Sequence, residues 1–343
     1  MDVIATIWKK PYYHDRNQRM IEAGINCFRV KCSHWGLEDI ATALQNARNQ
    51  LDESGKRVKL LADLPEAKIR LGHFPQEKIL LKAGTSLHFK YAEESADPFE
   101  FVPMTLEGFG NNLRVNDIFY TGDGQVAYRV DTVVDPNHVI VTTENAGVLN
   151  FHTAVTIPHA ADQLNHVTPF VKEIINILPQ CRPEMVAFSF VNSGDMAKEL
   201  VGMLQKVTTT NWNPQIIAKI ESPKGIEHID QILDHVGGIM VARGDLGLLV
   251  PYAKLGKVQK YLIRKAHEKK KYVIVATQIL QSLLDNHIPM RSDILDLTNI
   301  CLDGADAVML CAETAHSTTP ERAVTVAKEI IREMETPGLS VMK

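Results

Sequence analysis

The chain has 343 residues, of which 45% are hydrophobic and 23% charged, and its formal net charge is −4. This composition is ordinary for a globular protein and indicates no nucleic-acid partner. There is no uncharged apolar span of about 18 residues, so we expect no membrane partner either. The five cysteines are scattered without zinc spacing and no signal peptide is visible, so we expect free thiols and a cytoplasmic location.

Strands and helices alternate in the first part of the chain. Apolar runs at residues 3–7, 27–31 and 58–63 predict buried strands. Residues 15–23 and 36–51 have the apolar spacing of surface helices. This order of elements is typical of parallel β-α units.

The pattern changes between about residues 71 and 157. Short alternating or β-branched runs, separated by turns rich in Gly, Pro and Asn, predict a small all-β domain there.

The β-α alternation then returns. Further strands are predicted at 185–190, 215–220, 238–241, 273–277 and 307–310. Further helices are predicted at 168–178, 194–207, 226–235, within 252–270, at 292–302 and at 320–334.

The complete series contains eight strands, each followed by a helix. It predicts an α/β fold, a (β/α)₈ TIM barrel with the small all-β domain inserted after the third strand. The predicted division is residues 1–70 for the first part of the barrel, 71–157 for the insertion and 158–343 for the second part.

Charged residues gather at the predicted strand ends, where TIM barrels carry their chemistry. Lys219 and Glu221 are two residues apart on one strand and therefore point the same way. Asp245 follows the next strand, where a second carboxylate would meet Glu221 across a divalent ion. Arg29 and Lys31 share a strand face, which favours an anion. The alternative is a structural ion-pair cluster with Lys219 as the counter-ion.

Several segments carry a family resemblance. They are RVKCSHW (29–35), ADLPEAKIR (62–70), IIAKIESPKGIEHIDQIL (216–233) and GIMVARGDLGLLVP (238–251). In this order they resemble the pyruvate kinase family, and the resemblance runs through almost the whole chain. It implies a catalytic TIM barrel with an inserted β lid domain. The chain stops after the eighth helix, so we expect no C-terminal regulatory domain.

The resemblance implies a metal and a phosphate site. Glu221 and Asp245 would hold the catalytic Mg²⁺ or Mn²⁺. Lys219 would lie beside the transferring phosphoryl group, and Arg29 and Arg70 would contact its phosphate. Phosphoryl transfer requires positioning and charge neutralisation rather than a protein nucleophile, which suits these residue types.

The resemblance also implies where the rest of the substrate lies. Thr277 matches the hydroxyl near the enolate carbon, where the proton is delivered, and Ser189 matches a serine close to the metal. Free backbone N–H groups at a helix start suit an anion. The substrate carboxylate would lie against the turn formed by Ala242, Arg243, Gly244 and Asp245.

The first loops depart from the family pattern. The usual Thr-Ile-Gly-Pro is here Thr6-Ile7-Trp8-Lys9, and a usual glycine is Trp35. The two tryptophans would either stack on a ligand base or plug the barrel mouth. The residues predicted to lie near the nucleotide are Thr6, Lys9 and His34, the last interpreted mainly as a packed histidine.

The region that binds a monovalent cation in K⁺-dependent family members is also altered. Lys31 and Leu64 replace two of its four ligands, whereas Ser33 and Asp63 are kept. Lys68 stands where K⁺-dependent members have Glu. We therefore expect K⁺ not to be required, with a lysine charge in its place.

Three functions follow from these features. The first is Mg²⁺-dependent phosphoryl transfer between phosphoenolpyruvate and ADP, giving pyruvate and ATP. The second is a divergent enzyme, another kinase or a lyase, that acts on phosphoenolpyruvate or pyruvate enolate with a different acceptor. The third is a non-catalytic regulator that binds phosphoenolpyruvate. The altered loops favour the second and the intact metal ligands oppose the third. Formation of a homo-oligomer is open.

Overall fold

The computed structural model describes residues 1–7, 13–33, 36–158, 160 and 167–336. By its internal contacts the chain divides into two compact units. The first unit comprises Met1–Glu66, His166–Leu246 and Ala253–Lys343, and the second comprises Ala67–Asn165 and Gly247–Tyr252. Within the described ranges, no helix is long and apolar enough to cross a membrane.

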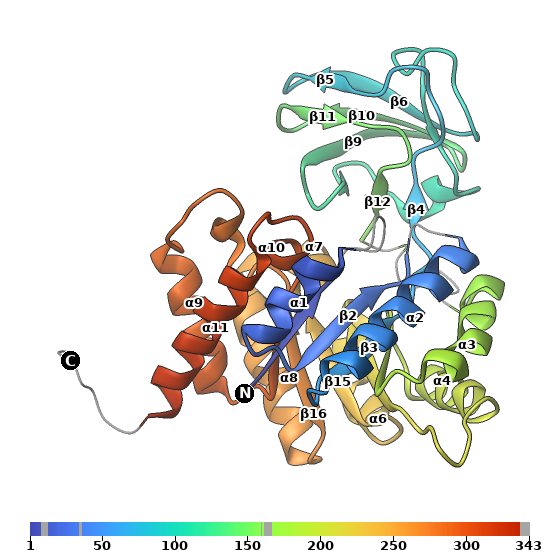
Figure 1. Cartoon of the computed structure of the whole chain (residues 1–343). Coiled ribbons are helices and arrows are strands. Elements are labelled where there is room, and N and C mark those ends of the chain that lie inside the picture. Colours follow the sequence, from blue (N-terminus) through green and yellow to red (C-terminus); the bar gives the residue numbers. More distant parts are fainter. Residues whose placement is uncertain (8–12, 34–35, 159, 161–166, 337–343) are drawn as a thin grey trace. The chain divides into compact units, whose positions relative to one another are not determined.

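The first unit contains a closed parallel barrel, in which the strands follow the order β1-β17-β16-β15-β14-β13-β3-β2 (Figure 1). The predicted TIM barrel is therefore confirmed. The barrel strands are β1 (Asp2–Thr6), β2 (Cys27–Lys31), β3 (Lys59–Asp63), β13 (Met185–Phe188), β14 (Gln215–Ile220), β15 (Gly238–Ala242), β16 (Tyr272–Ala276) and β17 (Ala307–Leu310).

Apolar side chains fill the inside of the barrel. Ile4, Leu61, Ile217 and Ile274 belong to one buried cluster to which each of the eight barrel strands contributes. The strands are buried on both faces, which explains why they appear in the sequence as continuous apolar runs rather than alternating ones.

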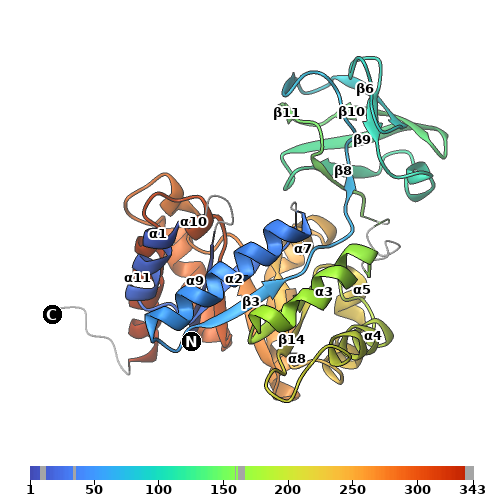
Figure 2. The same cartoon turned by 45° about the vertical axis from the view of Figure 1, so that its right-hand side comes forward.

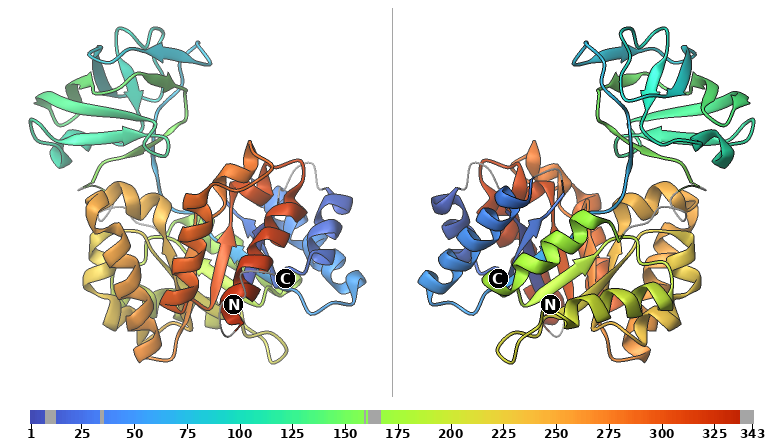
Figure 3. Two further views of the ribbon diagram at one scale, coloured as in Figure 1. Left: turned by 90° about the vertical axis from the view of Figure 1, so that its left-hand side faces the viewer. Right: turned by 90° about the vertical axis from the view of Figure 1, so that its right-hand side faces the viewer.

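Helices surround the strands on the outside (Figure 3), and α2 and α3 lie side by side (Figure 2). Thr168 and Ser193 cap α3 and α4 by accepting hydrogen bonds from Val171 N and Met196 N. The longer helices are α1 (His14–Glu22), α2 (Leu37–Ser54), α3 (Pro169–Cys181), α4 (Gly194–Gln205), α8 (Leu255–Glu268), α9 (Arg291–Asp303) and α11 (Pro320–Glu335). Shorter ones are α5 (Pro223–Glu227), α6 (Ile229–Leu233), α7 (Arg243–Leu249), α10 (Ala312–Ala315) and the 3₁₀ turns η3 (Tyr252–Lys254) and η4 (Gln281–Leu284).

One predicted helix differs from the structure. The single helix expected at 226–235 is two short helices, α5 and α6, that are separated at His228. His228 has φ −97° and ψ 18°, outside helical values, and its ring Nδ1 is 2.8 Å from the carbonyl oxygen of Asn192. The break therefore lies in the backbone angles of His228, and periodicity alone does not reveal it.

Where the structure describes it, the regular elements of the second unit are strands apart from η1 (Phe109–Asn112), the end of α7 and the first residue of η3. Its main sheet follows the order β4-β12-β8-β9-β10-β6-β7, and a separate pair joins β11 and β5. It begins before residue 71 because β4 pairs with β12, with Arg70 opposite Ala154. The strands are β4 (Ile69–Arg70), β5 (Ile79–Leu81), β6 (Ser86–Tyr91), β7 (Val102–Met104), β8 (Ile118–Thr121), β9 (Val126–Asp135), β10 (His138–Thr143), β11 (Gly147–Leu149) and β12 (Ala154–Thr156).

Stacked and edge-on rings form the core of this unit. Phe89 contacts both Phe119 and Tyr128 edge-on, and the last two rings stack at 5.2 Å between centroids. Such ring pairs add to the apolar burial itself. The unit therefore has a core of its own.

Candidate active site

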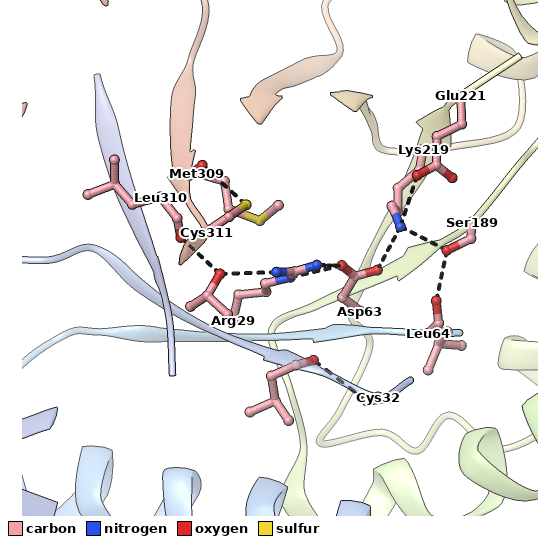
Figure 4. Close-up of polar contacts among 12 residues, drawn as sticks. Arg29, Cys32, Asp63, Leu64, Ser189, Lys219, Glu221, Met309, Leu310 and Cys311 are labelled. Atoms are coloured by element: carbon pink, nitrogen blue, oxygen red, sulfur yellow. Dashed lines mark hydrogen bonds and ion pairs between the residues drawn. The ribbon is translucent and has the colours of Figure 1, made fainter. Parts of the chain in front are cut away.

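A row of buried charges crosses the C-terminal ends of β2, β3 and β14 (Figure 4). Arg29 donates to Asp63 Oδ2 from Nε at 2.8 Å and from Nη2 at 2.5 Å. On the other side, Lys219 Nζ lies 3.3 Å from Asp63 Oδ1 and 3.2 Å from Glu221 Oε1. All four side chains are at most 7% exposed as residues. The structure therefore brings together four predicted residues from three separate segments of the chain.

Ser189 connects this row to the backbone. Its hydroxyl accepts a hydrogen bond from Lys219 Nζ at 2.8 Å and donates one to the carbonyl oxygen of Leu64 at 2.9 Å. The lysine ammonium thus has three oxygen neighbours, from Ser189, Asp63 and Glu221. The position of Lys219 is fixed by these contacts rather than by packing alone.

Electrostatics keep Lys219, Arg29 and Asp63 ionised. Burial alone would lower the pKa of Lys219, but Asp63 and Glu221 raise it above its usual value. Burial likewise opposes ionised Arg29, and Asp63 raises the pKa of its guanidinium. For Asp63, burial raises the pKa, but Lys219, Arg29 and Lys31 together hold it below its ordinary value. These three side chains therefore carry fixed charges at neutral pH.

Glu221 is the exception. Burial raises the pKa of its carboxyl group to about 7, Lys219 lowers it only partly, and the nearby Asp245 raises it further. The carboxylate accepts a hydrogen bond from the backbone N–H of Phe190 at 2.8 Å. Its negative charge is therefore incompletely compensated by protein groups, which is the condition under which a bound cation stabilises a buried carboxylate.

Glu221 and Asp245 thus fit a divalent cation as a pair of oxygen ligands. Among the residues that the structure describes, no group of three or more His, Cys, Asp and Glu side chains converges as a metal cluster. A protein with two carboxylate ligands suits Mg²⁺, which commonly keeps waters or substrate oxygens in its remaining positions.

The turn after β16 is strained. Thr277 and Gln278 have φ of 74° and 50°, a region that L-residues other than Gly seldom adopt. Each such residue costs on the order of 1–3 kcal/mol, and such strain is concentrated at functional sites. The buried Thr277 Oγ1 has no hydrogen-bond partner among the described residues. A polar atom left in this state is available to a ligand.

Gly244 lies beneath this hydroxyl at the start of α7. A Cβ added at Gly244 would lie 3.5 Å from Thr277 Cγ2 and 3.9 Å from Thr277 Oγ1. The structure therefore brings the predicted turn at Ala242–Asp245 and the predicted proton-delivering hydroxyl together.

Comparison with known proteins identifies the family. Residues 1–324 match the barrel domain of pyruvate kinase. The chain belongs to the pyruvate kinase family. It is 33% identical to the pyruvate kinase of Thermococcus litoralis over 97% of this chain and 69% of that protein. It is 28% identical to that of Thermotoga maritima over 97% and 70%, and 33% identical to that of Geobacillus stearothermophilus over 96% and 56%.

The family resemblance found in the sequence is confirmed. As a pyruvate kinase family member, the chain is an enzyme of the phosphotransferase class. It spans between 56% and 70% of the length of these three relatives.

Some predicted residues have other surroundings than expected. Thr6 Oγ1 donates to Leu310 O at 2.8 Å and accepts from Arg29 Nη1 at 3.1 Å, so its hydroxyl is engaged inside the barrel. Lys9 and His34, together with the two tryptophans of the altered loops, lie outside the described residues. Ser33 is buried.

Two predicted residues belong to the second unit. Arg70 is partly buried and donates from Nη1 to the carbonyl oxygen of His152 at 3.2 Å. Lys68 is partly exposed on the segment before β4.

Three contributions were missed from the sequence. The charge of Glu66 raises the pKa of Lys219, after the effects of burial, Asp63 and Glu221. Glu66 lies in the segment ADLPEAKIR that carries the family resemblance, but it was not singled out there. Phe190, at φ 51°, supplies the N–H for Glu221, and no sequence pattern marks it. The third contribution is the role of Arg243, whose side chain points toward the backbone carbonyls of the β16 turn.

Proposed function

We propose that this pyruvate kinase family member catalyses Mg²⁺-dependent phosphoryl transfer between phosphoenolpyruvate and ADP, giving pyruvate and ATP. The observation that carries the proposal is Lys219, an ammonium group held between Asp63 and Glu221 at 3.3 and 3.2 Å. The relatives are named pyruvate kinase, and in that reaction an ammonium group at this place would neutralise the transferring phosphoryl group.

The roles follow from the charges. Lys219 and Arg29 present fixed positive charge to the phosphoryl group as its bond to the enol oxygen breaks and its bond to the ADP oxygen forms. Because the pKa of Lys219 is raised above its usual value, the side chain carries its positive charge at neutral pH. Arg70 is proposed to add a second arginine contact to the phosphate.

The remaining roles concern pyruvate. We propose that Gly244 and the α7 start bind the substrate carboxylate through backbone N–H groups, which suit an anion at the start of a helix. The Thr277 hydroxyl, which has no partner among the described residues, is proposed to deliver the proton to the enolate carbon. Ser189 holds the Lys219 ammonium in position.

Glu221 and Asp245 are proposed to hold the Mg²⁺, or Mn²⁺ in its place. When bound, the ion neutralises negative charge on the substrate oxygens and polarises them. The raised pKa of Glu221 supports this assignment, because the cation would compensate charge that Lys219 leaves unbalanced.

We further propose that K⁺ is not required. Asp63, one of the retained residues of the family's cation region, already has Arg29 on one carboxylate oxygen and Lys219 on the other. Leu64 places an apolar side chain, 1% exposed, where an oxygen ligand is expected. Lys31 adds positive charge close enough to lower the pKa of Asp63, after burial, Lys219 and Arg29 have acted. The rate in K⁺-free buffer should equal that with K⁺ added, whereas a rate proportional to K⁺ would contradict the proposal.

The main test is a coupled assay with phosphoenolpyruvate, ADP and Mg²⁺ that measures pyruvate. We expect turnover in the unmodified chain and a loss of about 10³-fold or more in Glu221→Gln. Glu227→Gln, an exposed glutamate on α5, is the matched control and should retain the full rate. Binding of phosphoenolpyruvate without pyruvate formation from any nucleoside diphosphate would rule the proposed reaction out.

A further inference from the structure

The guanidinium of Arg243 binds the outer side of the turn that carries Thr277. Nε donates to Ala276 O at 3.3 Å, and Nη2 donates to Thr277 O at 2.5 Å and to Gln278 O at 3.2 Å. Three successive carbonyl groups thus accept from one side chain. Two of them belong to the residues with left-handed backbone.

The same side chain is anchored at its other edge. Nη1 donates to Asp296 Oδ1 on α9 at 2.9 Å and to Gln259 Oε1 on α8 at 3.4 Å. A guanidinium has five N–H donors, and here each of them has a protein acceptor. None is left for a substrate carboxylate, so the side chain of Arg243 is not a substrate contact.

Glu313 holds the turn from the other end. This carboxylate is fully buried and accepts from Ile279 N at 3.2 Å and from Cys311 N at 2.7 Å. The segment 276–279 is therefore fixed at its carbonyls by Arg243 and at its last N–H by Glu313. Strained residues persist only where the surroundings over-determine them, and these contacts do so here.

We propose that Arg243 is a positioning residue for Thr277: by holding the carbonyls of Ala276, Thr277 and Gln278, it keeps the left-handed turn formed and the Thr277 hydroxyl in place above Gly244. This role rests on the proposed function for its kinetic consequence, but not for its structural one. Lysine cannot replace the arginine, because a single ammonium has no planar fork to span three carbonyls and two side chains.

The kinetic test compares Arg243→Lys in two backgrounds. In the otherwise unmodified chain we expect kcat to fall about tenfold or more with KM for phosphoenolpyruvate changed less than about threefold, because the reacting hydroxyl is misplaced. In a Thr277→Ala background the same substitution should change kcat less than about twofold, since the hydroxyl that Arg243 positions is absent. A rise in KM alone, or an equal loss of kcat in both backgrounds, would overturn the proposal.

A second test needs no activity. Hydrogen exchange of the backbone amides in segment 276–280 should accelerate about tenfold or more in Arg243→Lys, because the turn opens locally. Arg264→Lys is the matched control, since its side chain is 66% exposed on α8, and it should leave this exchange unchanged. Unchanged exchange in Arg243→Lys would also overturn the proposal.

Asp296→Asn provides a milder variant in case Arg243→Lys does not fold. It keeps the arginine and weakens its anchor, so a smaller change in exchange and kcat in the same direction is expected; no change in either contradicts the proposal. If the chain has no pyruvate kinase activity but the exchange of segment 276–280 still responds to Arg243→Lys, the proposed reaction fails while the positioning role stands.

Discussion

The ends of β14 and β16 prepare their functional groups in opposite ways. At β14, the buried ammonium of Lys219 pairs with Glu221 at 3.2 Å and with Asp63 at 3.3 Å. At β16, Thr277 is uncharged, and the stored energy lies in its backbone at φ 74°. One strand end is therefore fixed by electrostatics and the other by hydrogen bonds to carbonyl groups, so they should respond differently to substitution.

The largest effect is expected at β14. Lys219→Met leaves Asp63 with only Arg29 and leaves Glu221 without its ion-pair partner. Removing one partner of a buried ion pair costs about 3–5 kcal/mol. We expect a loss of this size in the free energy of unfolding, measured by denaturant titration, together with loss of pyruvate formation.

Lys260→Met is the control for this change. Lys260 is 56% exposed in its pair with Asp303. An exposed pair contributes within about 1 kcal/mol. Equal losses of stability in both variants would show that the row at β14 is not a coupled electrostatic unit.

The next effect distinguishes the backbone strain at Thr277, after β16, from the role of its hydroxyl in the reaction. Thr277→Gly should raise the free energy of unfolding by about 1 kcal/mol, because glycine adopts positive φ without strain. The rate of pyruvate formation should nevertheless fall about 10²-fold or more, since the hydroxyl is lost. Thermal denaturation and the coupled assay on one preparation measure both.

Gln278→Gly provides the comparison within the same turn. The φ of Gln278 is 50°, so a glycine there removes the same kind of backbone strain, but the side chain that is lost is exposed. We expect a similar gain in stability with kcat reduced less than about tenfold. If Thr277→Gly lowers stability instead, the turn is not strained in the way that its backbone angles imply.

A third effect, on the pH dependence of stability, tests the charge of Asp63 at the end of β3. The pKa of Asp63 is lowered in the folded state: burial opposes ionisation, but Lys219, Arg29 and Lys31 outweigh it. The unfolded state therefore binds the proton more tightly, and the stabilisation is present above the ordinary aspartate pKa of about 4. It is lost as the pH falls from there through the folded-state pKa.

Asp63→Asn should make the free energy of unfolding fall less steeply with acidification below about pH 4. Asp15→Asn is the control, because the Asp15 side chain is fully exposed. An unchanged acid slope in Asp63→Asn would contradict the proposed balance of charges.

The smallest effect is expected between the two strand ends, at Gly244. A Cβ there would lie 3.5 Å from the nearest atom, Thr277 Cγ2, which is an ordinary contact. Gly244→Ala should change the free energy of unfolding by no more than about 0.5 kcal/mol. A large loss of stability would mean that the turn and the α7 start are packed more tightly than the structure indicates.

Much of the site was predictable because its residues follow apolar strands. Asp63 and Lys219 each follow a continuous apolar run, and Arg29 lies within the strand β2. The ends of parallel strands meet at one edge of a barrel. The spacing of Lys219 and Glu221 was sufficient to place both on one side of the chain. Sequence reasoning assigned Arg243 to the substrate, because a charged residue in a family motif does not reveal the direction of its side chain.

The sequence by itself determined the TIM barrel, the family and the set of charges at the strand ends, because periodicity and residue type are local properties. Only the tertiary structure decided how these charges pair. The ion pair of Arg29 with Asp63 joins residues from different strands, and the raised pKa of Glu221 depends on burial that no spacing encodes. The left-handed turn at Thr277 was likewise invisible, because threonine is a residue that propensity places elsewhere. It is held there by Arg243, whose acceptors in the turn lie more than 30 residues away in sequence.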